Sequence, residues 1–467
     1  MMSTAGLRVP TRGENQIPVR KADPPKLRRY GIGVAGRVPN RCVTVTLRSA
    51  LWSADRVFVI LRRISGVTGS VHLLNVRHHQ LADFFLPQNC PSGRKSGGRI
   101  KRMEDFFMKE FRVGIIGATG MVGQRFALLL ADHPWFKVTV MAASSRSAGK
   151  TYREAVGARW AFKDQPMPEQ FADLVIYDAG EDIEKIASQV DFCFCAVDMK
   201  KDALRALEEA YAKAECPIVS NNSAHRFTPD VPMIIPELNP EHLDIIASQK
   251  ARLGTKRGFI AVKSNCSIQS YVPALHPLRK FGIKTVLACT YQAISGAGKT
   301  FERWPEMIDN LIPYIGGEEE KSEQEPLKIW GTIENGEIVK ASSPLITTQC
   351  LRVPVSDGHT AAVFVKFENK PTEAEIKAAW AEYKGVPQEL GLPHAPKQFL
   401  NYFEEPDRPQ AKLDRNMEGG MAISVGRLRE DTLFDYKFVC LSHNTLRGAA
   451  GGAVELAELL AAKGYFD

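Results

Sequence analysis

The hydrophobic positions divide residues 108–467 into two parts. In the first part, short apolar runs such as FRVGIIG (111–117) and FKVTVMAAS (136–144) alternate with stretches of helical periodicity such as KKDALRALEEAYAKA. Apolar runs of this kind are typical of buried strands, and strands that alternate with helices pair in parallel through right-handed crossovers. The pattern therefore predicts an α/β domain with a doubly wound sheet over residues 108–263.

The second part, residues 264–440, has a different pattern. Its strands are longer, and several alternate apolar and polar positions, as in TVLACTYQAIS, TAAVFVKFEN and MAISVGRLRE. Alternation is typical of a sheet with one covered face, so this part predicts an α+β domain with a mixed sheet. The small-residue stretch GAAGGAVELAELLAAKGY predicts a helix. We expect this C-terminal segment, residues 441–467, to pack back on the first domain and complete it.

Residues 1–107 show no clear helical or strand period. They carry 19 Lys/Arg against 6 Asp/Glu, whereas the rest of the chain carries 42 against 47. We interpret them as a basic, poorly ordered extension. Organelle transit peptides share the Arg-rich, acid-poor composition, so a targeting segment and the product of an upstream translation start both remain open.

The composition excludes several classes of function. The mildly acidic body gives no indication of nucleic-acid binding. Nine cysteines without regular spacing argue against a disulfide framework, and Cys193 and Cys195 alternate along a predicted strand as core residues do. No CxxC or HExxH spacing occurs, so we expect no metal site. Charged residues interrupt each apolar stretch well before the roughly 18 residues that a membrane-spanning helix needs.

A glycine-rich turn joins the first predicted strand to the first predicted helix. It reads GATGMVG, a GxxGxxG variant of the dinucleotide fingerprint. Gly117 permits a tight turn, Gly120 lets the backbone approach a pyrophosphate, and Gly123 allows the helix to pack closely on the strand. The free N–H groups at the helix N-terminus stabilise phosphate charge. The first domain is therefore predicted to be of Rossmann type, with the following residues at the cofactor: Gly117, Thr119, Gly120, Met121 and Val122.

The second predicted strand ends in Ser144, Ser145, Arg146 and Ser147, where an NAD-binding protein carries an acidic residue. Hydroxyl groups and a guanidinium suit a ribose 2′-phosphate, so this loop predicts NADP rather than NAD as the cofactor. The alternative for Arg146 is an exposed loop residue without a ligand.

The stretch VKSNCSIQSY (262–271) places Cys266 between a predicted strand and a predicted helix that closes at Gly282. A helix N-terminus at this place would lower the pKa of the thiol and favour the reactive thiolate. The alternative is a buried cysteine that acts as a small hydrophobic residue.

Further polar residues follow the ends of predicted strands. Arg226 lies just after CPIVSNN, at the edge where open α/β sheets bind ligands, and its guanidinium suits a phosphate or a carboxylate. Gln292 ends an alternating strand and precedes SGAGKT, whose glycines Gly296 and Gly298 let the backbone approach a ligand.

Two charged pairs complete the set of candidates. Glu318 and Lys321 lie three residues apart and so share one face of a predicted helix, for which a solvated charged helix is the alternative. Arg352 and His359 flank a predicted strand–turn unit. A histidine beside a glycine at a turn is more often a surface residue, and it becomes a catalytic candidate because a cysteine nucleophile needs a base.

These sequence blocks resemble the aspartate-semialdehyde dehydrogenases, in particular their fungal and archaeal branch. The resemblance spans essentially all of residues 108–467 and is carried by GATGMVGQRF, ASSRSAGK, SNCS, QAISGAGKTF, LIPYIGGEEEK, RVPVSDGHT, APKQ, SVGRLRED and LSHNTLRGAAGG. Members of this family reductively dephosphorylate L-aspartyl 4-phosphate to the 4-semialdehyde with NADPH, on the route to lysine, threonine, methionine and isoleucine. Ile268 and His225 depart from the commoner pattern, and neither change removes a reacting group.

The resemblance implies a role for each candidate. Cys266 would form the acyl thioester, and His359 would be the acid/base. The implied substrate-binding residues are Arg226 and Lys321 at the phosphate, Arg352 at the α-carboxylate, Glu318 at the amino group and Gln292, which orients the substrate. Asn444 and Thr445 would contact the cofactor.

Two alternative functions remain open: a malonyl-CoA reductase of the same branch and a non-catalytic NADP-binding sensor. The resemblance implies a small-molecule substrate and phosphate as partners, and a homodimer or homotetramer with its interface in the second, catalytic and dimerisation domain. We expect a cytoplasmic protein, with organelle targeting by the extension as the alternative, because the extension has no counterpart in the family.

Overall fold

The computed structural model describes residues 110–467 and, before them, only seven short strands. The chain divides into two units, residues 1–100 and 101–467. The strands of the first unit pair antiparallel as β1 with β4, β2 with β3, and β5–β6–β7. Our expectation that the extension is poorly ordered concerns residues that the structure does not describe. The seven strands are β1 (Ile32–Gly33), β2 (Gly36–Val38), β3 (Arg41–Val43), β4 (Thr46–Leu47), β5 (Ala50–Ser53), β6 (Arg56–Leu61) and β7 (His72–Arg77).

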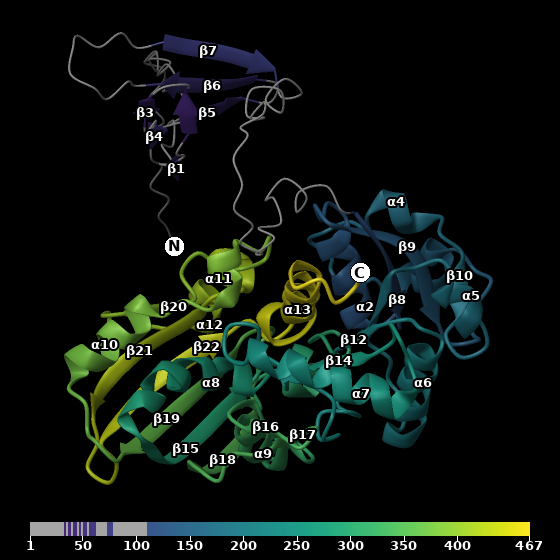
Figure 1. Ribbon diagram of the computed structural model, residues 1–467. Helices are drawn as coiled ribbons and strands as arrows, with labels where there is room; N and C mark the ends of the chain where they lie inside the picture. The colour runs from purple at the N-terminus through teal and green to yellow at the C-terminus, as the bar shows by residue number, and fades with distance from the viewer. Residues whose placement is uncertain are drawn as a thin grey trace, which may run out of the picture. The chain divides into compact units, whose positions relative to one another are not determined.

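The larger unit contains a seven-stranded sheet in which all the strands are parallel (Figure 1). The strand order is β10-β9-β8-β11-β12-β14-β13. Because the chain leaves β8 to one side and returns to its other side at β11, the sheet is doubly wound, as predicted, and its switch point lies between these two strands. The strands are β8 (Phe111–Ile116), β9 (Phe136–Ala143), β10 (Ile176–Asp178), β11 (Phe192–Cys195), β12 (Ile218–Ser220), β13 (Met233–Ile234) and β14 (Ile260–Lys263).

Helices pack on both faces of this sheet, and one of them comes from the far end of the chain (Figure 1). Helix α13 (Gly451–Ala462) is buried over most of its length, and it shares a hydrophobic core with Phe111 and Val113 of β8 and with Phe136 of β9. The other helices here are α2 (Met121–Leu130), α3 (Tyr152–Val156), α4 (Glu169–Ala172), α5 (Ile183–Ala187), α6 (Lys201–Lys213) and α7 (Ile246–Leu253). Helix α13 thus packs on strands β8 and β9, which lie more than 300 residues earlier in the chain.

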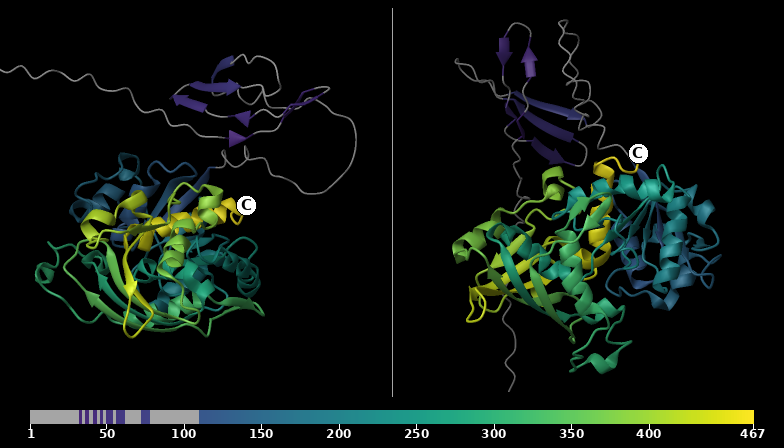
Figure 2. Two further views of the ribbon diagram at one scale, coloured as in Figure 1. Left: turned by 90° about the vertical axis from the view of Figure 1, so that its left-hand side faces the viewer. Right: turned by 60° about the horizontal axis from the view of Figure 1, so that its bottom comes forward.

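The second sheet has six strands in the order β18-β15-β19-β22-β21-β20, and it is mixed, as predicted. Figure 2 shows this green and yellow part of the chain from two further sides. Buried positions alternate with half-buried or exposed ones along β15 and β19. On the covered face, Trp380 of α10 is buried and donates its indole N–H to the carbonyl oxygen of Ala274 in α8. The strands are β15 (Ile283–Gln292), β18 (Leu345–Arg352), β19 (His359–Phe367), β20 (Leu400–Phe403), β21 (Ile423–Glu430) and β22 (Tyr436–Ser442).

The remaining elements belong to neither of the two large sheets. They are α8 (Val272–Leu275), α9 (Glu318–Ile329), the hairpin β16 (Thr332–Glu334) and β17 (Glu337–Val339), α10 (Glu373–Glu382), α11 (Val386–Leu390) and α12 (Ala411–Asp414). Within the part of the chain that the structure describes, no helix is long and apolar enough to cross a membrane.

The helix predicted after Cys266 is broken into three short pieces. A 3-10 turn over Ile268–Ser270 is followed by α8, which has only four residues, and by a second 3-10 segment over His276–Phe281. Pro273 and Pro277 each stand in the first turn of a new piece, because proline lacks the N–H that a continuous helix requires. The predicted end at Gly282 is confirmed: this residue has a φ of 71°.

Candidate active site

The glycine-rich turn joins β8 to α2 at the switch point of the first sheet. Gly117 has a φ of +87°, and a Cβ there would lie 2.3 Å from the carbonyl oxygen of Ala196. A Cβ at Gly123 would lie 2.2 Å from the carbonyl oxygen of Gly117, so the helix packs on the turn too closely for any side chain. At Gly120 a Cβ would meet only that oxygen, at 3.5 Å, and no side chain caps α2. The turn therefore fits the pyrophosphate of a dinucleotide.

The loop after β9 carries the residues predicted to select the cofactor. Ser144, Ser145 and Arg146 are exposed, whereas Ser147 is buried and donates its N–H to the carbonyl oxygen of Ser144 at 2.8 Å. The loop contains no carboxylate that could accept a hydrogen bond from the ribose 2′-hydroxyl of NAD. It therefore offers an exposed guanidinium and hydroxyl groups, which suit a 2′-phosphate.

Asn444 and Thr445 follow β22, and their side chains form hydrogen bonds with residues of several other segments. The amide of Asn444 donates to Oγ of Ser295 at 2.9 Å and accepts the N–H of Gly358 at 2.8 Å. Oγ1 of Thr445 lies 3.5 Å from Nη2 of Arg125, which belongs to α2. These contacts hold the SGAG loop, the start of β19 and the first helix of the nucleotide-binding domain in one arrangement.

Cys266 lies in the turn after β14, and its Sγ is 3.4 Å from Nε2 of His359 at the start of β19. Nδ1 of His359 accepts the backbone N–H of Ala293 at 3.0 Å. Because a backbone amide can only donate, Nδ1 carries no proton, and the proton of the neutral ring lies on Nε2. Burial lowers the pKa of His359 well below its usual value, so the ring is neutral at physiological pH. His359 therefore presents an N–H to the sulfur.

The expectation that a helix N-terminus lowers the pKa of Cys266 is wrong for the free protein. No continuous helix begins after the turn, and burial raises the pKa of the thiol, as does the carboxylate of Glu318. Three cations oppose this effect, namely Lys263, Arg226 and Arg352. Stabilisation of the thiolate thus depends on side-chain charge rather than on a helix dipole.

Arg226 is buried at the carboxyl edge of the first sheet and is held by three partners. Its Nη1 donates to Oε1 of Glu325 at 2.9 Å, its Nε donates to the carbonyl oxygen of Lys263 at 3.0 Å, and its Nη2 lies 3.4 Å from the carbonyl oxygen of Asn221. These bonds use three of the five N–H groups of the guanidinium. Two N–H groups are left for an anion.

Helix α9 presents a charged face to the site instead of to solvent. Glu318 is 6% exposed, and its Oε2 accepts a hydrogen bond from Nζ of the half-buried Lys321 at 3.0 Å. Two turns further along, Glu325 is fully buried and its Oε2 accepts the N–H of Asn265, the residue before the cysteine, at 2.6 Å. The solvated-helix alternative is therefore wrong for this face.

Arg352 and Gln292 end the neighbouring strands β18 and β15, where they are register partners. Nη1 of Arg352 donates to the carbonyl oxygen of Ala293 at 2.7 Å, and Nε2 of Gln292 donates to Oγ1 of Thr290 at 3.2 Å. A Cβ at Gly296 would lie 2.9 Å from Nη1 of Arg352 and 3.0 Å from Nε2 of His359. Gly296 therefore lets the SGAG loop close directly over both side chains.

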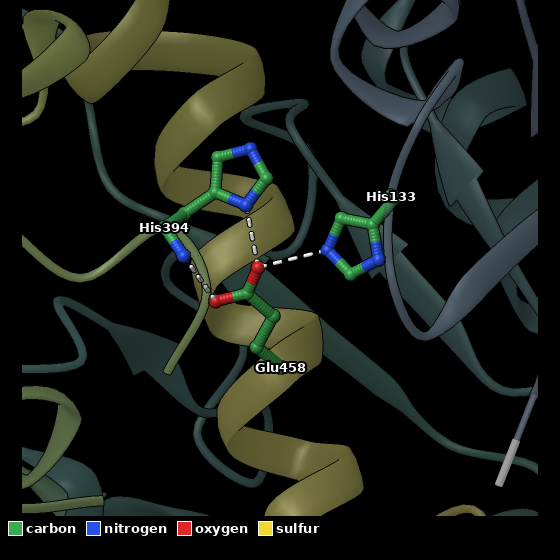
Figure 3. Close-up of side chains that lie close together, drawn as sticks. All are labelled: His133, His394 and Glu458. Atoms are coloured by element: carbon green, nitrogen blue, oxygen red, sulfur yellow. Dashed lines mark hydrogen bonds and ion pairs between the residues drawn. The ribbon is translucent and has the colours of Figure 1, made fainter. Parts of the chain in front are cut away.

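A separate cluster outside this site unites His133, His394 and Glu458, whose ligand-type atoms lie within 4.8 Å of one another (Figure 3). Oε1 of Glu458 faces Nε2 of His133 at 2.9 Å and Nδ1 of His394 at 2.5 Å. Nδ1 of His133 accepts the N–H groups of Trp135 and Phe136, so its proton lies on Nε2 and is donated to the carboxylate. A metal ion would have to bind a lone pair on Nε2, where the proton lies. Metal-binding histidines instead donate a proton from the ring nitrogen that does not bind the metal, and here that nitrogen, Nδ1, is an acceptor. The cluster is therefore a set of hydrogen bonds that joins three segments of the chain rather than a metal centre.

Several buried charged residues, some at the site and others in the fold around it, could not be identified from the sequence. Lys263 and Glu325 contact the cysteine turn, and Nζ of Lys328 donates to three backbone carbonyl oxygens, those of residues 226, 228 and 231. Arg447 forms buried ion pairs with Glu237 and Glu455. The spacing of Glu318, Lys321, Glu325 and Lys328, every three or four residues, was a usable signal for one continuous helix face.

Comparison with known families agrees with this arrangement. The family model described as "Semialdehyde dehydrogenase, NAD binding domain" matches residues 112–246. The model described as "Semialdehyde dehydrogenase, dimerisation domain" matches residues 275–447. The chain is thus a member of the semialdehyde dehydrogenases.

Relatives narrow the assignment further. The aspartate-semialdehyde dehydrogenase of Methanothermobacter thermautotrophicus is 44% identical over 351 residues, which cover 74% of this chain and 98% of the relative. That of Saccharomyces cerevisiae is 45% identical over 363 residues, 75% of this chain and 97% of the relative. The chain belongs to the aspartate-semialdehyde dehydrogenase family.

Solved structures of the same family share the fold. The aspartate-semialdehyde dehydrogenase of Candida albicans, solved with NADP, has a TM-score of 0.69 and 39% identity, and covers 76% of this chain and 100% of its own. Aspartate-semialdehyde dehydrogenase II of Vibrio cholerae has a TM-score of 0.59 and 26% identity, with 76% and 100% covered.

Proposed function

We propose that this chain catalyses the NADPH-dependent reductive dephosphorylation of L-aspartyl 4-phosphate to L-aspartate 4-semialdehyde, a step toward lysine, threonine, methionine and isoleucine. The observation that carries the proposal is the contact of Cys266 with His359, near three cations and the carboxylate of Glu318. An acyl phosphate with an amino-acid end requires that combination: a thiol nucleophile, positive charge for two anionic groups and negative charge for an ammonium.

The two ends of the substrate have different partners in this proposal. Arg226 and Lys321 bind the phosphate, since Arg226 keeps two N–H groups that its protein contacts do not use. At the other end Arg352 binds the α-carboxylate and Glu318 the α-ammonium, while Gln292 orients the chain between them. Family membership supports these roles.

The reaction proceeds through a thioester on Cys266. The thiol of Cys266 first loses its proton to solvent water, and the nearby cations stabilise the thiolate. The thiolate attacks the acyl carbon, the carbon–oxygen bond to phosphate breaks, and inorganic phosphate leaves toward Arg226. NADPH, when held by the glycine-rich turn and the loop after β9, would supply the hydride that reduces the thioester carbon. The resulting alkoxide collapses to the aldehyde as the carbon–sulfur electron pair returns to Cys266. Throughout, the Nε2–H of His359 donates a hydrogen bond to the sulfur, and its neutral state suits such a donor.

NADP is the proposed cofactor, and the loops that would hold it are those described above. The residues assigned to it are Gly117, Thr119, Gly120, Met121, Val122, Ser144, Ser145, Arg146, Ser147, Gly296, Gly298, Asn444 and Thr445. The Candida albicans relative solved with NADP supports this assignment.

We also propose domain limits and an oligomeric state. Residues 108–263 with 441–467 form the cofactor domain, and residues 264–440 form the catalytic and dimerisation domain. The half-exposed face of the second sheet carries apolar residues such as Ala362 and Phe364 between buried ones. Such a face suits a second copy of the chain, in a homodimer or homotetramer. We place the protein in the cytoplasm, with the basic extension as a candidate targeting segment.

A two-substrate assay tests the function. The purified protein should oxidise aspartate semialdehyde with phosphate and NADP⁺, and should reduce malonyl-CoA little or not at all. Malonyl-CoA lacks the ammonium, so the buried Glu318 would face its carboxylate as a like charge. Glu318→Gln should impair semialdehyde oxidation without changing NADPH affinity. Comparable efficiency on both substrates would favour a malonyl-CoA reductase, and NADPH binding without turnover on either would favour a sensor.

A further inference from the structure

Lys263 is the last residue of β14, three positions before Cys266, and it is 1% exposed. Its Nζ donates to the carbonyl oxygen of Ser264 at 2.8 Å and to that of Gly448. Burying an ammonium is costly, and an apolar side chain would fill the same space without that cost. A lysine at this place therefore needs a reason beyond packing.

Lys263 connects three parts of the site. A Cβ at Gly448 would lie 2.9 Å from Cβ of Cys266, so the backbone that Nζ holds lies directly against the nucleophile. The carbonyl oxygen of Lys263 accepts a hydrogen bond from Nε of Arg226 at 3.0 Å. The nucleophile turn, the loop after β22 and the phosphate-binding arginine thus all meet at this one residue.

We propose that Lys263 is a positioning residue for the reaction: it fixes the Gly448 backbone against Cys266 and places a buried positive charge beside the thiolate. The proposal rests on the proposed function only for the role of Cys266 as nucleophile. Arg226 and Arg352 also bring positive charge to the sulfur, but each is assigned to an anionic end of the substrate. Lys263 has no substrate group to neutralise it, so its charge remains available during the reaction.

The charges around Lys263 agree with this role. Burial lowers its pKa to about 7; Cys266 and Glu325 act in the opposite direction, whereas Arg226 and Arg447 lower it further. His359 also faces Lys263 and is neutral. Because a thiolate and an ammonium each favour the ionised form of the other, removal of one must shift the titration of the other.

The test is the pH dependence of alkylation of Cys266 by iodoacetamide, followed at the Cys266 peptide by mass spectrometry. In Lys263→Met the alkylation profile should move upward by about one pH unit or more, the usual effect of losing an adjacent opposite charge. At neutral pH this corresponds to a roughly tenfold lower rate. Alkylation needs neither substrate nor turnover, so the outcome does not depend on whether the chain acts on aspartyl phosphate.

Lys328→Met is the matched control. Lys328 is also buried, with its pKa lowered by burial to about 7, and its ammonium is bound to backbone carbonyl oxygens. Loss of Lys328 should reduce stability without moving the alkylation profile of Cys266. An unchanged profile in Lys263→Met, or the same shift in both variants, would overturn the proposal and leave Lys263 a structural residue.

Two further measurements cover the case in which Lys263→Met does not fold. Lys263→Gln keeps a donor for the Gly448 carbonyl while removing the charge, and it should show the same upward shift. In protein with ¹³Cε-labelled lysine, Cys266→Ala should move the titration of Lys263 to lower pH and leave that of Lys328 in place. If Lys263 titrates identically with and without the thiol, the proposal is wrong.

Discussion

The Nε2 atom of His359 lies 3.4 Å from the Sγ atom of Cys266, and the backbone N–H of Ala293 fixes which ring nitrogen bears the proton. A neutral ring in this tautomer has no lone pair facing the thiol. It can donate a hydrogen bond to a thiolate, but it cannot remove the thiol proton. The geometry therefore points to stabilisation of negative charge on sulfur as the contribution of His359.

This role gives a prediction for two substitutions at position 359. His359→Ala should lower kcat by roughly 10²–10³, the usual cost of losing one hydrogen-bond donor to a developing negative charge. His359→Gln places an amide N–H near the position of Nε2 and should retain a clear part of the activity. Steady-state kinetics with aspartate semialdehyde and phosphate measure both. Equal loss in the two variants would show that full proton transfer by the imidazole is required.

Gly296 offers a test of how closely the SGAG loop must approach. Gly296→Ala places a Cβ 2.9–3.0 Å from Arg352 and His359, closer than such contacts normally occur. We expect kcat/KM for the semialdehyde to fall at least about tenfold, since small misplacements of reacting groups are costly. Gly316→Ala is the control, because its Cβ would meet only the Tyr314 hydroxyl at 3.6 Å. A fully active Gly296→Ala enzyme would contradict the described loop position.

The cofactor preference is tested at Arg146. Arg146→Ala should raise KM for NADPH about tenfold or more, because a charge-assisted contact with the 2′-phosphate is lost, and should leave KM for NADH nearly unchanged. Arg153→Ala is a suitable control, since that exposed arginine pairs with Glu169 at 2.5 Å. Equal effects of Arg146→Ala on both cofactors would mean that Arg146 does not contact the 2′-phosphate.

A buried histidine predicts part of the acid sensitivity of the fold. Burial lowers the pKa of His276 to about 4, and its Nδ1 accepts the indole N–H of Trp330 at 3.2 Å. Below a pH of about 6.5 the unfolded chain binds a proton at this residue and the folded chain does not, so stability falls as pH falls. His276→Asn keeps an acceptor without titrating. We expect the loss of unfolding free energy between about pH 6 and 4.5 to be smaller by about 1.4 kcal/mol per pH unit.

Urea denaturation at fixed protein concentration across this pH range measures the difference. Parallel stability curves for the parent and His276→Asn would mean that His276 titrates alike in the folded and unfolded chain.

The sequence predicted those features of the site that are coded locally. Cys266 and the GATGMVG turn stand between a strand and a helical segment, and short-range patterns report such places well. The break after the cysteine was also readable, because Pro273 and Pro277 lie in the predicted helix. The apolar periodicity predicts a continuous helix there, but each proline lacks the N–H that such a helix needs and stands in the first turn of a new piece.

Residues whose role depends on distant packing could not be found in this way. Glu325 acquires its role only because α9 lies against the turn after β14, and Lys263 only because the loop after β22 lies against the same turn. Likewise, His133 and Glu458 are 325 positions apart. Spacing can show that Glu318 and Lys321 share a helix face, but it does not show whether that face meets solvent or protein.

Helix α13 has a consequence for the order in which the chain folds. Its buried residues belong to the same core as β8 and β9, yet they are synthesised after the whole second sheet. During synthesis, the apolar surface of the nucleotide-binding sheet that α13 covers therefore stays exposed until the last residues leave the ribosome. A nascent chain that ends before Gly451 therefore contains every strand of the second sheet but lacks part of the core of the nucleotide-binding domain, so cofactor binding is completed only at the end of synthesis.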